Sequence, residues 1–152
     1  MQEKPMKKTS NNYISNNIND TFDFSSMFAK KLKPSDIVCL IGDLGVGKTV
    51  IAKGIAKYFN VDTDVISPTF NILKIYDVKN SIIKRIYHYD LYRLKSINEL
   101  YNIGFDEYIS DSNAIHIIEW PEIAKELLPK NHYKVSIEYD KYSPDKRIIK
   151  YE

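Results

Sequence analysis

The segment GDLGVGKT, residues 42–49, holds the groups best suited to chemistry in this sequence. Its spacing is G-x-x-x-x-G-K-[ST], in which glycines let successive backbone N–H groups turn inward around a phosphate. Lys48 can reach the β and γ phosphates of a nucleotide, and the hydroxyl of Thr49 can ligate Mg²⁺. An apolar run at residues 37–41 precedes the segment and a helical pattern at 48–59 follows it, as this motif requires. We therefore predict a nucleotide-binding loop.

Two acidic residues are candidates to complete the site. Asp90 ends the run IYHYD, residues 86–90, and Glu119 ends the run AIHIIE, residues 114–119. Ligands of open α/β sheets bind at the carboxyl ends of strands, so either carboxylate could hold Mg²⁺ directly or through water. The other carboxylate could then orient the attacking water. An arbitrary acidic residue after a strand is more often a solvated cap or a salt-bridge partner, but a nearby phosphate loop favours the catalytic interpretation.

Alternating strands and helices must position these residues. Continuous or alternating apolar runs predict strands, and apolar spacing of three and four residues predicts helices. The expected strands are residues 37–41, 70–76, 82–89, 114–119, 133–139 and 147–151, and the expected longer helices include 48–59 and 121–128. Ser96 and Glu99 form a capping-box pattern for a short helix that Gly104 ends. We expect an α/β fold with a hairpin formed by the second and third strands and a closing antiparallel pair.

The first residues of the chain are polar and rich in asparagine. Residues 1–19 hold too few apolar side chains to anchor themselves to a core, so we expect a flexible lead-in. Order is expected to begin near Thr21, in an amphipathic helix for which Asp20, Thr21 and Asp23 are capping candidates. Residues 20–152 are expected to form a single domain.

Composition argues against several kinds of protein. The net charge of +2 and pI of about 8.4 are too balanced for gripping nucleic acid by charge alone, so any RNA contact would be shared with a partner. The single cysteine, Cys39, permits no disulfide within the chain, and the three histidines lack companion cysteines for structural zinc. No apolar run approaches the ~20 residues of a membrane span. We expect a cytoplasmic protein with no membrane contact.

Four motifs closely resemble those of the bacterial TsaE, or YjeE, family. They are GDLGVGKT (42–49), SPTF (67–70), YHYDLYRL (87–94) and IIEWP (117–121), in that order. The family is the ATPase component of the machinery that makes threonylcarbamoyladenosine in tRNA. The resemblance runs from about Thr21 to Ile149. Val46 stands where alanine is usual and Tyr89 where phenylalanine is common, and neither departure removes a ligand.

The resemblance implies a P-loop NTPase-like three-layer sandwich with a mixed, mainly parallel sheet and antiparallel additions. It implies ATP and Mg²⁺ as ligands, with weak hydrolysis that partner proteins activate. Those partners would be a TsaD-like transferase, which catalyses threonylcarbamoyl transfer, and a TsaB-like scaffold. The tRNA would be the substrate of the whole assembly, and this chain would support its turnover.

Carried over by position, the resemblance assigns metal binding to Thr49 and Glu119 and makes Asp90 the second essential acid. The loop residues that would bind the nucleotide are Asp43, Leu44, Gly45, Val46, Gly47, Lys48 and Thr49. The catalytic set would be Lys48, Asp90 and Glu119.

Four further residues carry two interpretations each. Thr69 resembles a nucleotide-sensing switch, but a local turn hydrogen bond explains it equally well. Thr21 could contact the nucleotide or cap the first helix. Trp120 could stack on adenine, although a large aromatic beside a strand end is more often core. His88 could shuttle protons, although a histidine inside a strand more commonly has a structural role.

Two other functions remain open from the residues alone. A small-molecule kinase would share the P-loop and Mg²⁺ but would need a closing lid with cationic residues, and no arginine-rich insert follows the loop helix. A nucleotide-gated binding module would use ATP to order a switch segment, with hydrolysis incidental. The module differs from a weak ATPase only in degree.

Overall fold

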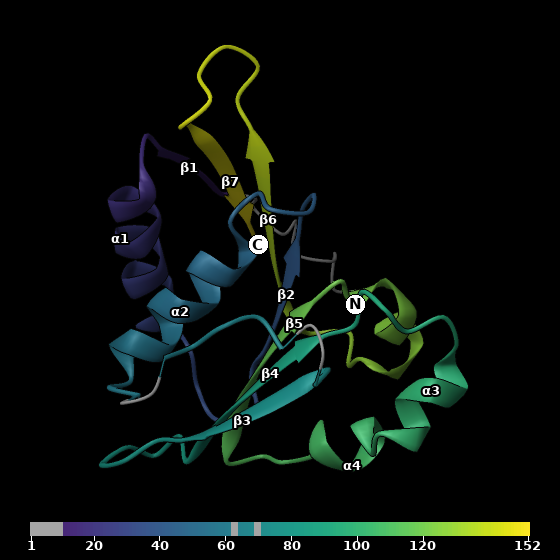
Figure 1. Cartoon of the computed structure of the whole chain (residues 1–152). Helices are drawn as coiled ribbons and strands as arrows, with labels where there is room; N and C mark the ends of the chain where they lie inside the picture. The colour runs from purple at the N-terminus through teal and green to yellow at the C-terminus, as the bar shows by residue number, and fades with distance from the viewer. Residues whose placement is uncertain (1–10, 62–63, 69–70) are drawn as a thin grey trace, which may run out of the picture.

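Figure 1 shows the computed structural model of the chain, which describes residues 11–61, 64–68 and 71–152. The strands are β1 (Asn11–Ser15), β2 (Ile37–Ile41), β3 (Leu73–Asp77), β4 (Arg85–Asp90), β5 (Ala114–Glu119), β6 (Tyr133–Tyr139) and β7 (Arg147–Tyr151). The helices are α1 (Ile18–Ala29), α2 (Lys48–Tyr58), α3 (Ile97–Asn102), α4 (Phe105–Tyr108) and the 3₁₀ helix η1 (Pro121–Leu127). Among these helices, none is both long and apolar enough to cross a membrane.

The strands form one seven-stranded mixed sheet in the order β1-β7-β6-β2-β5-β4-β3. Its four middle strands, β6, β2, β5 and β4, run parallel to one another. The two edges are antiparallel additions, β3 beside β4 on one side and β7 with β1 on the other. The predicted hairpin and the predicted closing pair are both confirmed. The sheet is therefore mixed with antiparallel additions, as the sequence indicated.

Helices cover both faces of the sheet, which gives the predicted three layers. Figure 1 shows α1 and α2 on one face and α3 and α4 on the other. Along β2, Val38 and Leu40 pack toward α1 and α2, whereas Ile37 and Cys39 pack into the second cluster. Because successive strand residues point to opposite faces, burial on both faces produces the continuous apolar run of β2.

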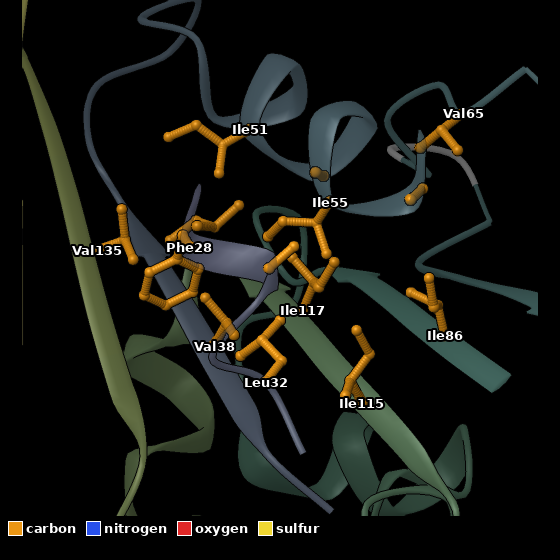
Figure 2. Packing of buried hydrophobic residues seen from close by; sticks show 14 of the residues in the cluster. Phe28, Leu32, Val38, Ile51, Ile55, Val65, Ile86, Ile115, Ile117 and Val135 are labelled. Carbon is orange, nitrogen blue, oxygen red and sulfur yellow. The ribbon is translucent and has the colours of Figure 1, made fainter. Parts of the chain in front are cut away.

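The larger core cluster anchors the helix that follows the glycine-rich loop. Figure 2 shows Ile51 and Ile55 of α2 facing Val38 of β2 and Ile117 of β5. All four side chains are buried almost completely. Burying each such side chain stabilises the fold by about 1.5–3 kcal/mol. The packing fixes α2 with its first residue at the end of β2.

Strand register brings the two candidate acids to one edge of the sheet. In the parallel β4–β5 pair Asp90 lies opposite Glu119, and in the β2–β5 pair Leu40 lies opposite Glu119. The loop that leaves β2 at Ile41 therefore begins beside Glu119. The carboxyl ends of the parallel strands β2, β4 and β5 therefore meet at the edge of the sheet that carries the glycine-rich loop and the two candidate acids.

The start of the chain differs from the prediction. Residues Asn11–Ser15 form an edge strand paired with β7, and α1 begins at Ile18 with Asn17 as its cap. The side chain of Asn17 accepts a hydrogen bond from the Asp20 N–H at 2.9 Å. The expectation of a flexible lead-in is wrong for residues 11–19. Pairing with β7 orders residues 11–15, and the last two residues of the segment begin α1. The observed cap, Asn17, therefore lies before all three of the residues predicted to cap this helix.

The segment after β5 also differs in detail from the prediction. It is a 3₁₀ helix, and its N-cap residue Trp120 has the left-handed backbone angles φ 57° and ψ 61°. Pro121 occupies the first turn, where its missing N–H removes no helical bond. A bulky residue with positive φ is uncommon and costs about 1–3 kcal/mol. The turn sends the Trp120 ring back toward the glycine-rich loop.

Candidate functional site

The glycine-rich loop between β2 and α2 has the backbone shape of a phosphate cradle. Gly45 and Gly47 adopt positive φ angles of 77° and 125°, which residues with a side chain rarely adopt. A Cβ atom at Gly42 would lie 2.6 Å from the carbonyl oxygen of Ile137, so no side chain fits there. Gly47 is the N-cap of α2. The free N–H groups and the positive dipole end of α2 therefore face the loop.

The ammonium group of Lys48 lies at the centre of this loop. Its Nζ donates hydrogen bonds to the carbonyl oxygens of Gly42 and Asp43, the latter at 3.0 Å. It also lies 4.0 Å from the centre of the Trp120 ring, within cation–π range. Burial lowers the pKa of Lys48, and the nearby carboxylates, Glu119 foremost, oppose that shift. The Lys48 side chain is thus held as a buried cation that a phosphate could bind.

Glu119 is a buried carboxylate that joins α2 to β4. Its Oε1 accepts a hydrogen bond from the Thr49 hydroxyl at 3.3 Å. Its Oε2 lies 2.7 Å from Nε2 of His88, a residue that is also buried. The Thr49 hydroxyl and the Glu119 carboxylate therefore place two oxygen ligands side by side at the start of α2. Oxygen donors are the ligands that Mg²⁺ prefers.

Asp90 lies at the other side of the same cavity. Its Oδ2 accepts a hydrogen bond from the Ser67 hydroxyl at 2.8 Å, and its Oδ1 accepts one from the Tyr92 N–H at 3.1 Å. The ring of Tyr92 lies 4.9 Å from that of Trp120. Both oxygens of the Asp90 carboxylate are therefore oriented by neighbours. The hydrogen bond from Ser67 ties the first residue of the SPTF motif to Asp90.

Two of the cavities beside the loop bear on the candidate site. The first, which we call the Lys48 cavity, has a volume of 300 Å³ and holds the predicted catalytic residues on its wall. It is lined by Leu44, Gly45, Gly47, Lys48, Thr49, Val50, Ser67, Asp90, Tyr92, Glu119 and Trp120. The second, the Thr21 cavity, has a volume of 510 Å³ and lies between the loop, the start of α1 and the residues before and at the start of β7. Gly45, Gly47 and Val50 line both cavities.

The predicted residues fall into four groups. The structure brings Lys48, Thr49, Asp90 and Glu119 together on the wall of the Lys48 cavity. The other loop residues assigned to the nucleotide are Asp43, Leu44, Gly45, Val46 and Gly47, of which Leu44 is 69% exposed and Val46 is buried. Thr21 lines the second cavity, where its hydroxyl hydrogen-bonds that of Ser15 at 2.7 Å. Thr69 lies outside the described residues.

Sequence reasoning missed Arg147. Its Nε donates to the carbonyl oxygen of Val46 at 2.9 Å, and its guanidinium lies 4.5 Å from the centre of the Tyr139 ring. The side chain thus braces the glycine-rich loop from β7 and lines the Thr21 cavity. No local pattern could reveal this contact, because the two residues are 101 positions apart in the sequence. Ser67 was also missed, although it stands in the SPTF motif beside the residue that was chosen.

The candidate metal ligands are few. In the part of the chain that the structure describes, no group of three or more His, Cys, Asp or Glu side chains could hold a metal ion. Mg²⁺ bound with a nucleotide commonly takes one or two protein oxygens and completes its shell with phosphates and water. The pair formed by Thr49 and Glu119 fits that kind of site.

Comparisons with known proteins point to one family. The family model "Threonylcarbamoyl adenosine biosynthesis protein TsaE" matches residues 15–149. The Rickettsia typhi protein named "tRNA threonylcarbamoyladenosine biosynthesis protein TsaE" is 50% identical over 114 residues, 74% of this chain and 76% of that protein. The Rickettsia bellii protein of the same name is 43% identical over 144 residues, 94% of this chain and 95% of that one.

More distant relatives show the same likeness. The Bacillus subtilis protein with that name is 35% identical over 121 residues, 80% of this chain and 73% of the relative. The crystal structure of YdiB from Bacillus subtilis superposes with a TM-score of 0.76 at 28% identity, covering 94% of this chain and 84% of that one. The similarity thus extends over nearly the whole sheet and both helical layers.

Proposed function

This chain belongs to the TsaE family, and from that premise we propose that it binds and weakly hydrolyses ATP as a subunit of the tRNA threonylcarbamoyladenosine machinery. One observation carries the ATPase part of this proposal. Lys48, Thr49 and Glu119 meet Asp90 on the wall of one cavity at the glycine-rich loop. A cation, two oxygen ligands and a second acid at a phosphate cradle are the parts that nucleotide hydrolysis requires.

The loop would hold the phosphates of ATP. Its N–H groups and the start of α2 provide oriented positive dipoles. Lys48 now donates to two backbone carbonyls, and a phosphate oxygen would be a stronger acceptor because it carries charge. When ATP binds, we expect the Lys48 ammonium group to leave the two backbone carbonyls and the face of the Trp120 ring and to bind the β and γ phosphates.

The Thr21 cavity would hold the nucleoside. It adjoins the loop on the side away from Asp90, and its 510 Å³ is large enough for a base and a ribose. Thr21, Asn17 and Arg147 supply polar groups on its wall. The assignment of Thr21 to the nucleotide is compatible with this placement, and its role in the first turn of α1 does not exclude it.

Mg²⁺ would be held by Thr49 and Glu119 together with the phosphates. When bound, such an ion neutralises the charge that develops on the transferred phosphoryl group. Glu119 keeps Oε1 turned toward Thr49. Asp90 would orient the attacking water, because its carboxylate lies on the wall of the same cavity and an ionised carboxylate accepts hydrogen bonds.

The role in tRNA modification comes to this chain from the family. We propose a TsaD-like transferase and a TsaB-like scaffold as its partners, in the cytoplasm, with tRNA reached through them. Tyr92 is 53% exposed beside the Lys48 cavity, so a docked partner could reach the site. This exposure supports a hydrolysis rate that depends on partners.

The test is magnesium-ATP turnover by this chain with and without its organism's transferase and scaffold, with modified tRNA measured in the same reactions. We expect slow turnover alone and faster turnover with the pair, accompanied by continued tRNA modification. Nucleotide binding without any effect of the pair would refute the assigned role and leave a P-loop ATPase. Transfer of the γ phosphate to a small molecule would favour the kinase alternative.

A further inference from the structure

Two buried histidines of the central sheet differ in how their ring nitrogens are bonded. His116 of β5 has both nitrogens in hydrogen bonds, Nδ1 with the Tyr89 hydroxyl and Nε2 with the carbonyl oxygen of Asp111, each at 3.1 Å. His88 of β4 bonds through Nε2 to Glu119. Its Nδ1 is buried and has no hydrogen-bond partner in the described part of the chain. The His88 ring therefore interacts with one polar group, and that group is the proposed metal ligand.

The position of His88 follows from strand alternation. Ile86, His88 and Asp90 lie on the face of β4 that α2 covers, and Ile86 belongs to the core cluster beneath α2. In the parallel pair His88 lies opposite Ile117, two residues before Glu119. Ile86 lies opposite Ile115 in the same pair, and Figure 2 shows both side chains on the side of the sheet that α2 covers. The imidazole thus reaches the carboxylate from the core side, away from the loop.

The imidazole is the firmer of the two protein groups that hold the carboxylate. The Thr49 hydroxyl is 3.3 Å from Oε1, a long separation for an O–H donor, whereas His88 Nε2 is 2.7 Å from Oε2. An ionised carboxylate only accepts hydrogen bonds, so Nε2 carries the proton and donates. Glu119 is only 3% exposed. Water therefore does little to orient its carboxylate.

A purely structural role does not explain this arrangement. His116 shows how this sheet satisfies a histidine in its core. A buried polar atom without a partner costs stability, and an aliphatic side chain at position 88 would fill the space without that cost. The N–H of Nε2 toward Glu119 is what an imidazole provides there and an aliphatic side chain does not.

We propose that His88 is a positioning residue, which holds the Glu119 carboxylate with Oε1 toward Thr49 and thereby sets the affinity of the site for Mg²⁺ with ATP. The inference rests on the proposed function. The terminal torsion of a glutamate is broad and two-fold, so without the imidazole the carboxylate turns away from Thr49. Groups that orient metal ligands in this way commonly change metal affinity by about 10–100-fold when they are replaced.

The test compares three substitutions that differ in where they place a donor. The amide nitrogen of His88→Gln reaches the position of Nε2, that of His88→Asn reaches only the position of Nδ1, and His88→Phe has no donor. ATP binding is measured by calorimetry across a magnesium titration and again in chelator. We expect His88→Asn and His88→Phe to raise the half-saturating Mg²⁺ concentration by about 10-fold or more. His88→Gln should stay close to the unchanged protein, and binding in chelator should be the same for all.

His116→Phe is the matched control, because it removes a buried histidine of the same sheet that does not contact Glu119. It should lower the melting temperature and leave the magnesium titration unchanged. If His88→Gln and His88→Asn shift the titration equally, or if neither does, His88 has only a structural role and the inference is overturned. The Gln and Asn pair decides this even if the Phe variant does not fold. Absence of magnesium-dependent ATP binding in the unchanged protein would instead overturn the proposed function itself.

Discussion

Lys48 and Glu119 are two buried charges with different duties. Lys48 contacts the loop carbonyls and the Trp120 ring, and Glu119 contacts Thr49 and His88. The cation is therefore placed for phosphate and the anion for metal. Replacing each one should affect a different step of nucleotide use.

Lys48→Ala should weaken ATP binding by at least about 10-fold, because a charge-assisted hydrogen bond contributes about 1.5–3 kcal/mol. Binding can be followed by the fluorescence of Trp120, the one tryptophan of the chain, or by calorimetry where its ring responds weakly. Lys53→Ala is a matched control in the same helix, because Lys53 lies away from the Lys48 cavity. Equal losses in the two variants would contradict the assignment of Lys48.

Glu119→Ala should retain metal-free ATP binding while losing most magnesium-dependent turnover. The variant keeps Lys48 and the loop but removes the carboxylate beside Thr49. A magnesium titration of turnover with the partner pair present measures the effect. An unchanged magnesium requirement would remove Glu119 from the metal shell and leave Asp90 as the acid to examine.

The position of a residue within its helix or strand decides whether the sequence predicts its place in the candidate site. Lys48, Thr49, Asp90 and Glu119 were predictable because each stands at a strand end or a helix start, and parallel strands bring such ends together. Arg147 was not, because no local pattern shows that its side chain reaches the backbone of Val46, 101 positions earlier in the chain.

The same distinction applies to the fold. Helix α2, the strand β5 and the final pair were predictable from their own apolar patterns. The strand β1 was not, because NNYIS is polar and exposed on one side and becomes a strand only by pairing with β7. The left-handed turn at Trp120 was equally hidden, since nothing in a tryptophan favours that backbone.

The packing of α1 on α2 depends on the absence of a side chain at Gly54. A Cβ atom there would lie 2.4 Å from Cβ of Ser25 and 2.8 Å from its Oγ. Gly54→Ala should therefore destabilise the fold by about 1–3 kcal/mol, even though alanine favours a helix more than glycine does. Denaturant unfolding measures the loss.

A double-mutant cycle separates this clash from helix propensity. Ser25→Gly removes the two nearest atoms that the new methyl group would meet, so it should recover part of the loss in the Gly54→Ala background. If the losses of unfolding free energy in Gly54→Ala and Ser25→Gly simply add in the double variant, α1 and α2 do not approach each other as closely as the structure shows.

Polar groups on the α4 side of the sheet make the stability of the whole molecule depend on pH. Burial lowers the pKa of His116, and the hydrogen bond from Arg85 is the main cause that lowers the pKa of Asp111 from 3.8 to about 2. The contact from Arg85 Nε to Asp111 Oδ2 is 2.8 Å. Both groups therefore release protons more readily in the folded chain than in the unfolded one.

The free energy of unfolding should fall in two steps as pH is lowered. His116 contributes stability above its unfolded pKa of 6.5, and this is lost as pH falls below that value toward the lower folded pKa. Asp111 contributes stability that is lost between pH 3.8 and about 2. Urea unfolding at a series of pH values measures both steps. His116→Gln should remove the first step and leave the second, and an unaltered curve would show that another group causes the first.

The pairing of β1 with β7 bears on how the protein is made. β1 is translated before the other described elements, and its neighbour in the sheet is translated after them. Until β7 has been translated, β1 lacks its partner, and Arg147 is not yet available to brace the glycine-rich loop. This edge of the sheet therefore forms only after β7 has been made, so we expect a ribosome-bound fragment ending before β7 to capture ATP poorly.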